Sequence, residues 1–208
     1  MRDYAIGVDL GGTNLRAAAV DRDGKMLNKI AGTSAGADRE TVIRDMVDSI
    51  KALQAGLPDQ QLKGVGVGVP GFILMDQGIV LTAPNLPALE NYPVRDEVER
   101  LLGAKVILEN DANAAALGEQ WIGAGRGVDD LILLTLGTGI GSGIIVDGKI
   151  LRGCLGMAAE IGHTTYAPNG YPCGCGNTGC VEKYASATAV SAMAKLMASE
   201  SAVRICDR

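Results

Sequence analysis

The chain has 208 residues, of which 47% are hydrophobic and 21% charged, and its formal net charge is −5. This composition is typical of a folded globular protein and excludes a disordered one, and an acidic balance without runs of Lys and Arg argues against nucleic acid as a partner. The apolar stretch without charges over residues 131–146 contains four glycines and is shorter than the roughly 20 apolar residues of a membrane span, so we expect a cytoplasmic protein without a membrane segment or a signal peptide.

The first part of the chain predicts three strands followed by a helix. Three short apolar runs separated by glycine-containing turns have the length of strands: Tyr4–Leu10, Leu15–Val20 and Lys25–Ile30. Apolar residues then recur at helical spacing over Asp38–Ala55, and Gly56 follows the last of them.

The middle of the chain alternates strands with helices. The predicted elements are a strand over Gly64–Val69, a helix over Val94–Leu102, a strand over Lys105–Glu109 and an alanine-rich helix from residue 110 to about Trp121. Such alternation predicts an α/β fold, in which a mainly parallel or mixed sheet is covered by helices. A last helix is expected over Val181–Ser199.

The three-strand pattern of the N-terminus returns later in the chain. Strands are predicted over Leu131–Leu136, Gly143–Val146 and Lys149–Leu151, and aligning Gly11 with Gly137 places Asp21 opposite Asp147. Both aspartates open a turn that ends in Gly-Lys. A chance match is the alternative, but we interpret the repeat as two related lobes with a central cleft, over residues 1–120 and 121–208. Few residues follow Leu151, so we expect the second lobe to be incomplete, which leaves the activity of the 208-residue chain open.

Each copy of the repeat contains a glycine-rich turn between two strands. The first turn, residues 9–14, contains Asp9, Gly11, Gly12, Thr13 and Asn14, and its counterpart over residues 137–143 contains Gly137, Thr138 and Gly139. Glycines let the main chain approach an anion, and amide and hydroxyl groups can then donate to phosphate oxygens. An aspartate at a strand end can hold Mg²⁺. The two turns are therefore predicted to grip the phosphates of ATP.

A glycine-rich turn between two strands also fits roles unrelated to ATP. Each turn alone could be a tight hairpin without a ligand. A dinucleotide site requires a Gly-x-Gly-x-x-Gly run that opens a helix, whereas both runs here open strands, and the Gly-Lys-Ser/Thr of a Walker A loop does not occur. Two glycine-rich hairpin turns that face a common cleft favour the architecture of an actin-type ATPase.

Four motifs taken together resemble the ROK family, which comprises bacterial sugar kinases and related repressors. They are Asp-Leu-Gly-Gly-Thr-Asn at 9–14, Glu-Asn-Asp-Ala-Asn at 109–113, Gly-Thr-Gly-Ile-Gly at 137–141 and Glu-Ile-Gly-His at 160–163. The resemblance covers essentially the whole chain. It implies an actin-like (ribonuclease H-like) ATPase fold, and a family member would continue into a longer C-terminal portion that completes the second lobe.

Asp111 is the candidate catalytic base. It stands where a strand ends and a helix begins, and a helix N-terminus favours the carboxylate form, which can accept the proton of a sugar hydroxyl. Helix capping by Asn110 or Asp111 is the alternative. The resemblance implies that Asp111 is the catalytic aspartate and that Asn110 beside it binds sugar.

Further polar positions are candidates for binding sugar hydroxyls. Gly71 and Asn85 follow the Gly64–Val69 strand, at the open end of the sheet, and the resemblance implies sugar contacts for Glu160, His163 and Glu182. A turn is the alternative role for Asn85, and a solvated surface position is the alternative for Glu182.

One histidine and three cysteines predict a structural zinc site. His163, Cys173, Cys175 and Cys180 fall within a short glycine-rich loop, residues 163–180, and His with three Cys suits tetrahedral zinc. Disulfides are the alternative, but cytoplasmic thiols stay reduced. The resemblance implies the same four ligands. A closed four-ligand site leaves no position for a reacting water, so we expect zinc to brace the sugar-binding loop.

These observations predict ATP-dependent phosphorylation of glucose on its 6-hydroxyl, with ATP, Mg²⁺ and structural Zn²⁺ as cofactors. The alternatives are a kinase for fructose, mannose or an N-acetylhexosamine, because the predicted pocket binds hydroxyls that several hexoses share, and a non-catalytic ROK sugar sensor. Members of the family are often dimers, so the resemblance allows a homodimer.

Overall fold

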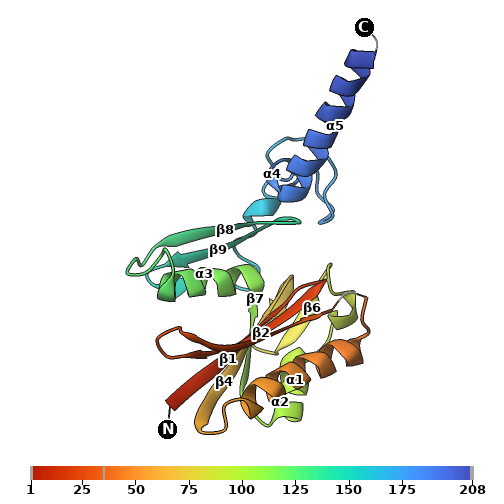
Figure 1. The fold of residues 1–208 in the computed structure, drawn as a ribbon. Helices are drawn as coiled ribbons and strands as arrows, with labels where there is room; N and C mark the ends of the chain where they lie inside the picture. The colour runs from red at the N-terminus through yellow and green to blue at the C-terminus, as the bar shows by residue number, and fades with distance from the viewer. Residues whose placement is uncertain (1, 35, 207–208) are drawn as a thin grey trace.

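The computed structural model describes residues 2–34 and 36–206, with side chains for residues 3–34 and 36–198. A five-stranded sheet forms its N-terminal part (Figure 1), with the strand order β3-β2-β1-β4-β7. The strands are β1 (Arg2–Leu10), β2 (Asn14–Asp21), β3 (Met26–Thr33), β4 (Gln60–Val69) and β7 (Val106–Asn110). β1, β2 and β3 pair antiparallel, whereas β4 is parallel to both β1 and β7. The carboxyl ends of β1, β4 and β7 therefore meet at one edge of the sheet.

Two helices, α1 (Arg39–Ala55) and α2 (Val94–Leu102), lie together on one side of this sheet (Figure 1). α1 begins after Asp38, whose side chain accepts a hydrogen bond from the Thr41 amide at 2.8 Å. Its buried residues are those of the predicted apolar face: Val42, Ile43, Met46, Val47, Ile50 and Leu53. They join the buried side chains of β1, β2, β4 and β7 in the main hydrophobic core, which fixes the strand ends that carry the polar residues.

A second, antiparallel sheet has the order β10-β9-β8 and consists of β8 (Leu131–Leu136), β9 (Ile140–Val146) and β10 (Lys149–Ile150). Helix α3 (Asp111–Ile122) starts at the end of β7 and packs on this sheet (Figure 1). The packing is close, since a Cβ atom on Gly143 would lie 2.6 Å from the Ala116 Cβ and 2.8 Å from the Ala112 carbonyl oxygen. The large apolar side chains of β8 are exposed, Ile132 by 61% and Leu134 by 51%, unlike those of β1.

The structure bears out the predicted internal repeat at the level of its hairpins. β1-β2-β3 and β8-β9-β10 are both antiparallel and consecutive, with a glycine-rich turn after the first strand of each. Asp21 accepts hydrogen bonds from the amides of Asp23 and Lys25. Gly24 and Gly148 both have positive φ, 80° and 70°, as the matching Gly-Lys turns require.

Several predicted elements differ from the observed ones. β9 begins at Ile140 rather than Gly143. A small hairpin of β5 (Phe72–Leu74) and β6 (Ile79–Thr82) was not predicted, because its strands are too short to give a clear alternation. The predicted Val181–Ser199 helix is two helices, α4 (Glu182–Ala185) and α5 (Ala187–Cys206), because Ser186 between them is extended.

Two short 3₁₀ turns, η1 (Pro87–Leu89) and η2 (Ile161–His163), complete the fold. Within the described residues, no helix is both long enough and apolar enough to span a bilayer. The predicted lobe boundary between residues 120 and 121 falls within the last turn of α3 and stays a prediction. Residues 1, 35, 207 and 208 of the two predicted lobes lie outside the described residues.

Candidate functional site

The first glycine-rich turn connects β1 to β2 and presents free amide groups. The Gly11 amide donates to the Asn14 carbonyl at 2.9 Å, and the Thr13 carbonyl accepts from the Ser34 amide at 3.0 Å. Among the described residues, no acceptor lies within hydrogen-bonding distance of the Gly12 and Thr13 amides. Successive amides of this kind can bind a phosphate.

Gly12 and Asn85 are in close contact. A Cβ atom on Gly12 would lie 2.5 Å from the Asn85 carbonyl oxygen, so a larger residue would displace one of the two segments. The predicted sugar-binding residue Asn85 is therefore next to the first glycine-rich turn, and the segment that follows β6 packs against this turn.

The second glycine-rich turn lies between β8 and β9 and is tied to the C-terminal helices. The Gly137 amide donates to the Gly139 carbonyl at 3.0 Å, and the Gly137 carbonyl accepts from the Ala187 amide at the start of α5, also at 3.0 Å. The Ile140 amide donates to Glu182 Oε2 at 3.3 Å. Thr138 is exposed between these bonds, where its hydroxyl could reach an anion.

The junction of β7 and α3 shows which residue caps the helix. Asn110 Oδ1 accepts from the amides of Ala112 and Asn113 at 3.0 and 3.1 Å, and Asn110 Nδ2 donates to the Gly71 carbonyl at 3.3 Å. Asn110 is thus the N-cap, and Asp111 is the first helical residue. Helix capping alone does not account for Asp111. The predicted sugar contact of Asn110 stays a prediction, since its amide already bonds protein groups.

Asp111 is exposed to solvent, yet partial desolvation by the protein groups around it dominates its ionisation. The desolvation raises the pKa of this carboxyl above its ordinary value, the negative charge of Asp9 raises it further, and the hydrogen bond from the Ala112 amide opposes both. The helix N-terminus does favour the carboxylate through the Ala112 amide, as expected, but desolvation of the carboxylate outweighs this local effect. A raised pKa makes the carboxylate a better proton acceptor.

Glu160, His163 and Glu182 lie together near Asp111. The pKa of Glu160 is raised, chiefly by burial and further by the charges of Asp111 and Glu182, whereas His163 lowers it. His163 Nε2 lies 4.0 Å from Glu160 Oε2. The structure thus forms a chain of carboxylates, Asp9, Asp111, Glu160 and Glu182, each within electrostatic reach of the next, from the first turn to the second.

Gly71 supports this site through its main chain. Its φ is +98°, and a Cβ atom would overlap the Thr82 carbonyl oxygen, so only glycine fits. Because its own carbonyl accepts from Asn110, the position orients the helix cap, and a direct contact with sugar stays a prediction.

The four predicted zinc ligands converge. The ligand atoms of His163, Cys173, Cys175 and Cys180 all lie within 4.8 Å of one another. The Sγ atoms of Cys175 and Cys180 are 3.7 Å apart, and Cys173 Sγ is 3.5 Å from His163 Nδ1. A tetrahedral zinc with ordinary bond lengths requires S···S and S···N separations of about 3.8 and 3.5 Å, so these residues fit the ion.

The chemistry of the thiols agrees with a site built for a cation. Burial raises the pKa of Cys173 to about 12 and also raises that of Cys180, whereas a hydrogen bond from the Asn177 amide lowers that of Cys175; thiols that bind zinc lose their protons to do so. Cys173 Sγ also donates to Glu182 Oε1 at 3.3 Å. The His163 and cysteine cluster and the second glycine-rich turn therefore share Glu182 as a neighbour.

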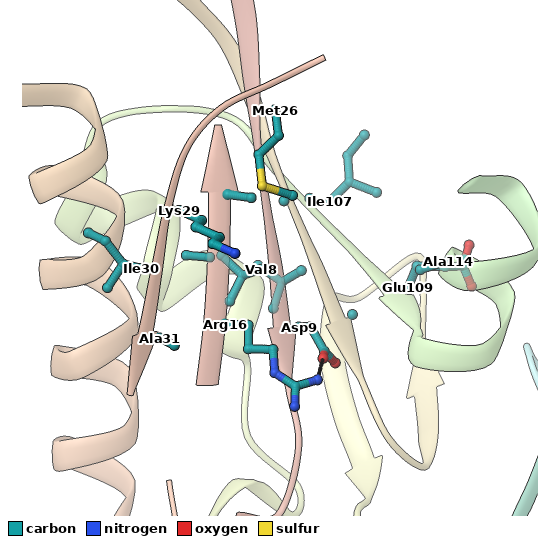
Figure 2. A pocket seen from close by; sticks show the side chains of 16 residues that line it. Val8, Asp9, Arg16, Met26, Lys29, Ile30, Ala31, Ile107, Glu109 and Ala114 are labelled. Carbon is teal, nitrogen blue, oxygen red and sulfur yellow. Dashed lines mark ion pairs between the residues drawn. The ribbon is translucent and has the colours of Figure 1, made fainter. Parts of the chain in front are cut away.

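A cavity of about 880 Å³ opens on the face of the five-stranded sheet away from α1 and α2. Figure 2 shows the side chains that line it: Arg16 and Asp9 form an ion pair of 3.6 Å, and Glu109 and Ala114 lie to the right of this pair in the view. Asp9 and Glu109 are at the carboxyl ends of their strands, so the cavity borders the polar cluster.

Sequence reasoning overlooked one prominent pair, Glu109 and Arg152. Arg152 Nε and Nη2 donate to Glu109 Oε2 at 2.9 and 2.6 Å. Glu109 belongs to the quoted 109–113 motif, which could have drawn attention to it, but nothing in the local sequence marks Arg152 as its partner.

Comparison with known proteins places these features in context. A family model described as the ROK family matches residues 5–205. The chain is 47% identical over 186 residues to a glucokinase of Thermotoga maritima, covering 89% of this chain and 58% of the relative. It is 39% identical to a xylose repressor of Caldicellulosiruptor bescii over 91% of this chain and 48% of that protein.

The fold agrees with a solved structure of the same kind. A ROK family glucokinase from Streptomyces griseus, crystallised with glucose and AMPPNP, superposes with a TM-score of 0.80 at 42% identity, over 95% of this chain and 62% of that one. The predicted actin-like α/β fold is thereby confirmed. The chain spans about three fifths of the length of these two glucokinases.

Proposed function

The chain belongs to the ROK family, and on that premise we propose that the protein transfers the γ-phosphoryl group of ATP to the 6-hydroxyl of glucose. The observation that carries the proposal is the placement of Asp111, a solvent-accessible carboxyl whose pKa is raised by partial desolvation, between Asp9 of the first glycine-rich turn and Glu160. The relatives support glucose as the sugar, since the Thermotoga maritima and Streptomyces griseus proteins are glucokinases.

In the proposed reaction Asp111 accepts the proton of the 6-hydroxyl while the sugar oxygen attacks the γ-phosphorus, and the bond to the β-phosphate bridging oxygen breaks to release ADP. Free amides of the turns at residues 9–14 and 137–143 hold the phosphates. Asp9 at the end of β1 would hold Mg²⁺, which neutralises charge on the transferred group.

The sugar would be oriented by side chains around Asp111. Glu160 and Glu182 can accept hydrogen bonds from hydroxyls, and His163 Nε2 can donate one, because its Nδ1 points to the cysteine cluster. Zinc held by His163, Cys173, Cys175 and Cys180 would fix the loop that carries these groups. Asn85, Asn110 and Gly71 complete the proposed site.

A panel of hexoses tests the substrate. The purified protein at its natural length is assayed for ADP release with glucose, fructose, mannose and N-acetylmannosamine, at fixed Mg-ATP. The highest kcat/KM is expected with glucose. A higher value with another hexose would replace glucose by that sugar and leave the phosphotransferase in place.

A sugar sensor without turnover is the second candidate, and the match to a xylose repressor supports it. Such a protein would bind sugar in calorimetry yet release no ADP with any hexose. Detectable turnover with one sugar of the panel rules it out.

A further inference from the structure

The side chain of Glu109 lies at the centre of a network between the two sheets. It is on β7, directly before the helix cap, and is only 8% exposed. Its Oε1 accepts from the Asn110 amide and from Asn113 Nδ2, both at 3.1 Å, while Oε2 accepts two hydrogen bonds from Arg152. Both oxygens of the buried carboxylate are therefore satisfied, and each points to a different part of the site.

The contacts of Oε1 hold the first turn of α3. Asn113 is a buried residue of that turn, and Asn110 is its N-cap. Asp111 lies between these two residues, so Glu109 holds the chain on both sides of the proposed base. A shift of Glu109 would move the Asp111 carboxyl along with the start of the helix.

The contacts of Oε2 hold the segment that leads to Glu160. Arg152 follows β10, and its carbonyl accepts from the Ala158 amide at 3.1 Å, which folds residues 152–158 into a compact turn. The Ser142 hydroxyl donates to the Ala159 carbonyl and accepts from the Ile161 amide. Glu160 is thus held between two anchors, the bond of Arg152 to β7 and the bonds of Ser142 on β9.

We propose that the Glu109–Arg152 ion pair is a positioning pair, which sets the distance between the base on α3 and the sugar-binding carboxylate on the segment after β10. In this proposal the pair acts through Asp111 and Glu160 and not by binding sugar or ATP itself. The inference rests on the proposed function and adds two positions to its machinery.

A purely stabilising role explains the arrangement less well. The Glu109 side chain is 10% exposed but that of Arg152 is 42% exposed, and an ion pair with a solvent-exposed partner contributes little net stability because water screens the attraction. The Arg–carboxylate contact through two nitrogens is directional as well as strong. Arg152 joins two segments that are 43 residues apart in the chain. A directional contact can fix the position of two such segments relative to each other.

The test uses Glu109→Gln, Arg152→Met and the double variant in the protein at its natural length. Gln is nearly isosteric and keeps an acceptor for the Asn113 side chain, but it carries no charge to pair with the guanidinium. In Glu109→Gln the Arg152 guanidinium loses its carboxylate partner. The double variant also removes this guanidinium, so it should fold even if a single variant is unstable. Glu97→Gln is the control, because Glu97 and Arg100 form an exposed pair on α2 with the same chemistry.

Each variant is measured for kcat, for KM of glucose and of ATP, and for its melting temperature. We expect kcat/KM for glucose to fall about 10- to 100-fold in all three variants, as for a misplacement of about 1 Å, with the KM of ATP and the values of Glu97→Gln close to those of the wild type. The double variant should lose no more than either single variant, since the two residues act as one unit.

The proposal is overturned if the double variant regains both stability and wild-type kcat/KM, or if the variants lose only melting temperature. If the wild type phosphorylates none of the hexoses, the proposed function fails by itself. The pair is then judged by calorimetric binding of glucose: a Kd raised in the variants retains the positioning role, and an unchanged Kd removes it.

Discussion

Replacing Asp111 with asparagine isolates the chemical contribution of the proposed base. Asn110 accepts from the amides of Ala112 and Asn113, so the helix cap stays intact. An asparagine oxygen at position 111 can still accept the hydrogen bond from the Ala112 amide, which measures 2.9 Å in the wild type. The substitution therefore changes the charge and basicity of one side chain and leaves the local geometry as it is.

The expected loss is that of a general base. Such groups contribute about 10²- to 10⁴-fold to the rate, so kcat of Asp111→Asn should fall by this factor, or about 3–5 kcal/mol of barrier. The KM of glucose should change little, because the contacts with sugar hydroxyls that we propose for Glu160, His163 and Glu182 would remain. A coupled assay for ADP at saturating Mg-ATP measures both constants.

Stability should move in the opposite direction. The folded-state pKa of Asp111 lies above its unfolded value, so its favourable contribution belongs to the protonated form at low pH and is lost as pH rises through the folded pKa. At neutral pH the partly desolvated carboxylate carries a small cost, which its exposure to solvent limits and which asparagine removes. The melting temperature of Asp111→Asn at pH 7 should equal or exceed that of the wild type.

The pH profile adds a second signature. Asp9 and Glu160 both face Asp111, and only the carboxylate form of the base accepts a proton. As the pH is lowered, kcat at saturating glucose should therefore begin to fall at a pH above the ordinary aspartate pKa of about 3.9. This acid-side fall in kcat should be much weaker in Asp111→Asn. Asp96→Asn, a first-turn position of α2 with an exposed side chain, is the control and should leave kcat unchanged. A variant at position 111 with near-normal kcat would refute the assignment.

Three further outcomes follow from the geometry. Metal analysis should find one zinc per chain, and Cys175→Ser should lower the zinc content in the same assay. Chelation of the zinc should raise the KM of glucose. A content well under one zinc per chain would contradict the proposed zinc site. Gly143→Ala should destabilise the fold by about 1–3 kcal/mol in denaturant unfolding, because its Cβ would lie 2.6 Å from that of Ala116. Gly32→Ala, which meets nothing within 4 Å, should stay within about 0.5 kcal/mol, and equal losses in both would remove the packing argument. Gly12→Ala should raise the KM of Mg-ATP, since the new methyl displaces the turn, and an unchanged KM would separate this turn from ATP.

The amino-acid sequence alone determined those features that rest on local pattern. Strand–turn–strand repeats around Gly11 and Gly137 are encoded by glycines and apolar runs a few residues long, and the helix over Asp38–Ala55 by its periodicity and its cap. The cysteine cluster was equally local, since its ligand spacing reflects tetrahedral chemistry. These signals need no knowledge of distant contacts.

The tertiary structure alone decided what depends on segments that meet in space. Desolvation, which no local pattern reveals, outweighs the effect of the helix N-terminus on the pKa of Asp111. The partner of Glu109 is 43 residues away, so its identity follows from how α3 and the second sheet pack. Glu182 is likewise a neighbour of both the Ile140 amide and Cys173 only because the loop folds back on the second turn. Long-range packing sets dielectric environment and side-chain distance, and these two quantities turn separate polar residues into a site.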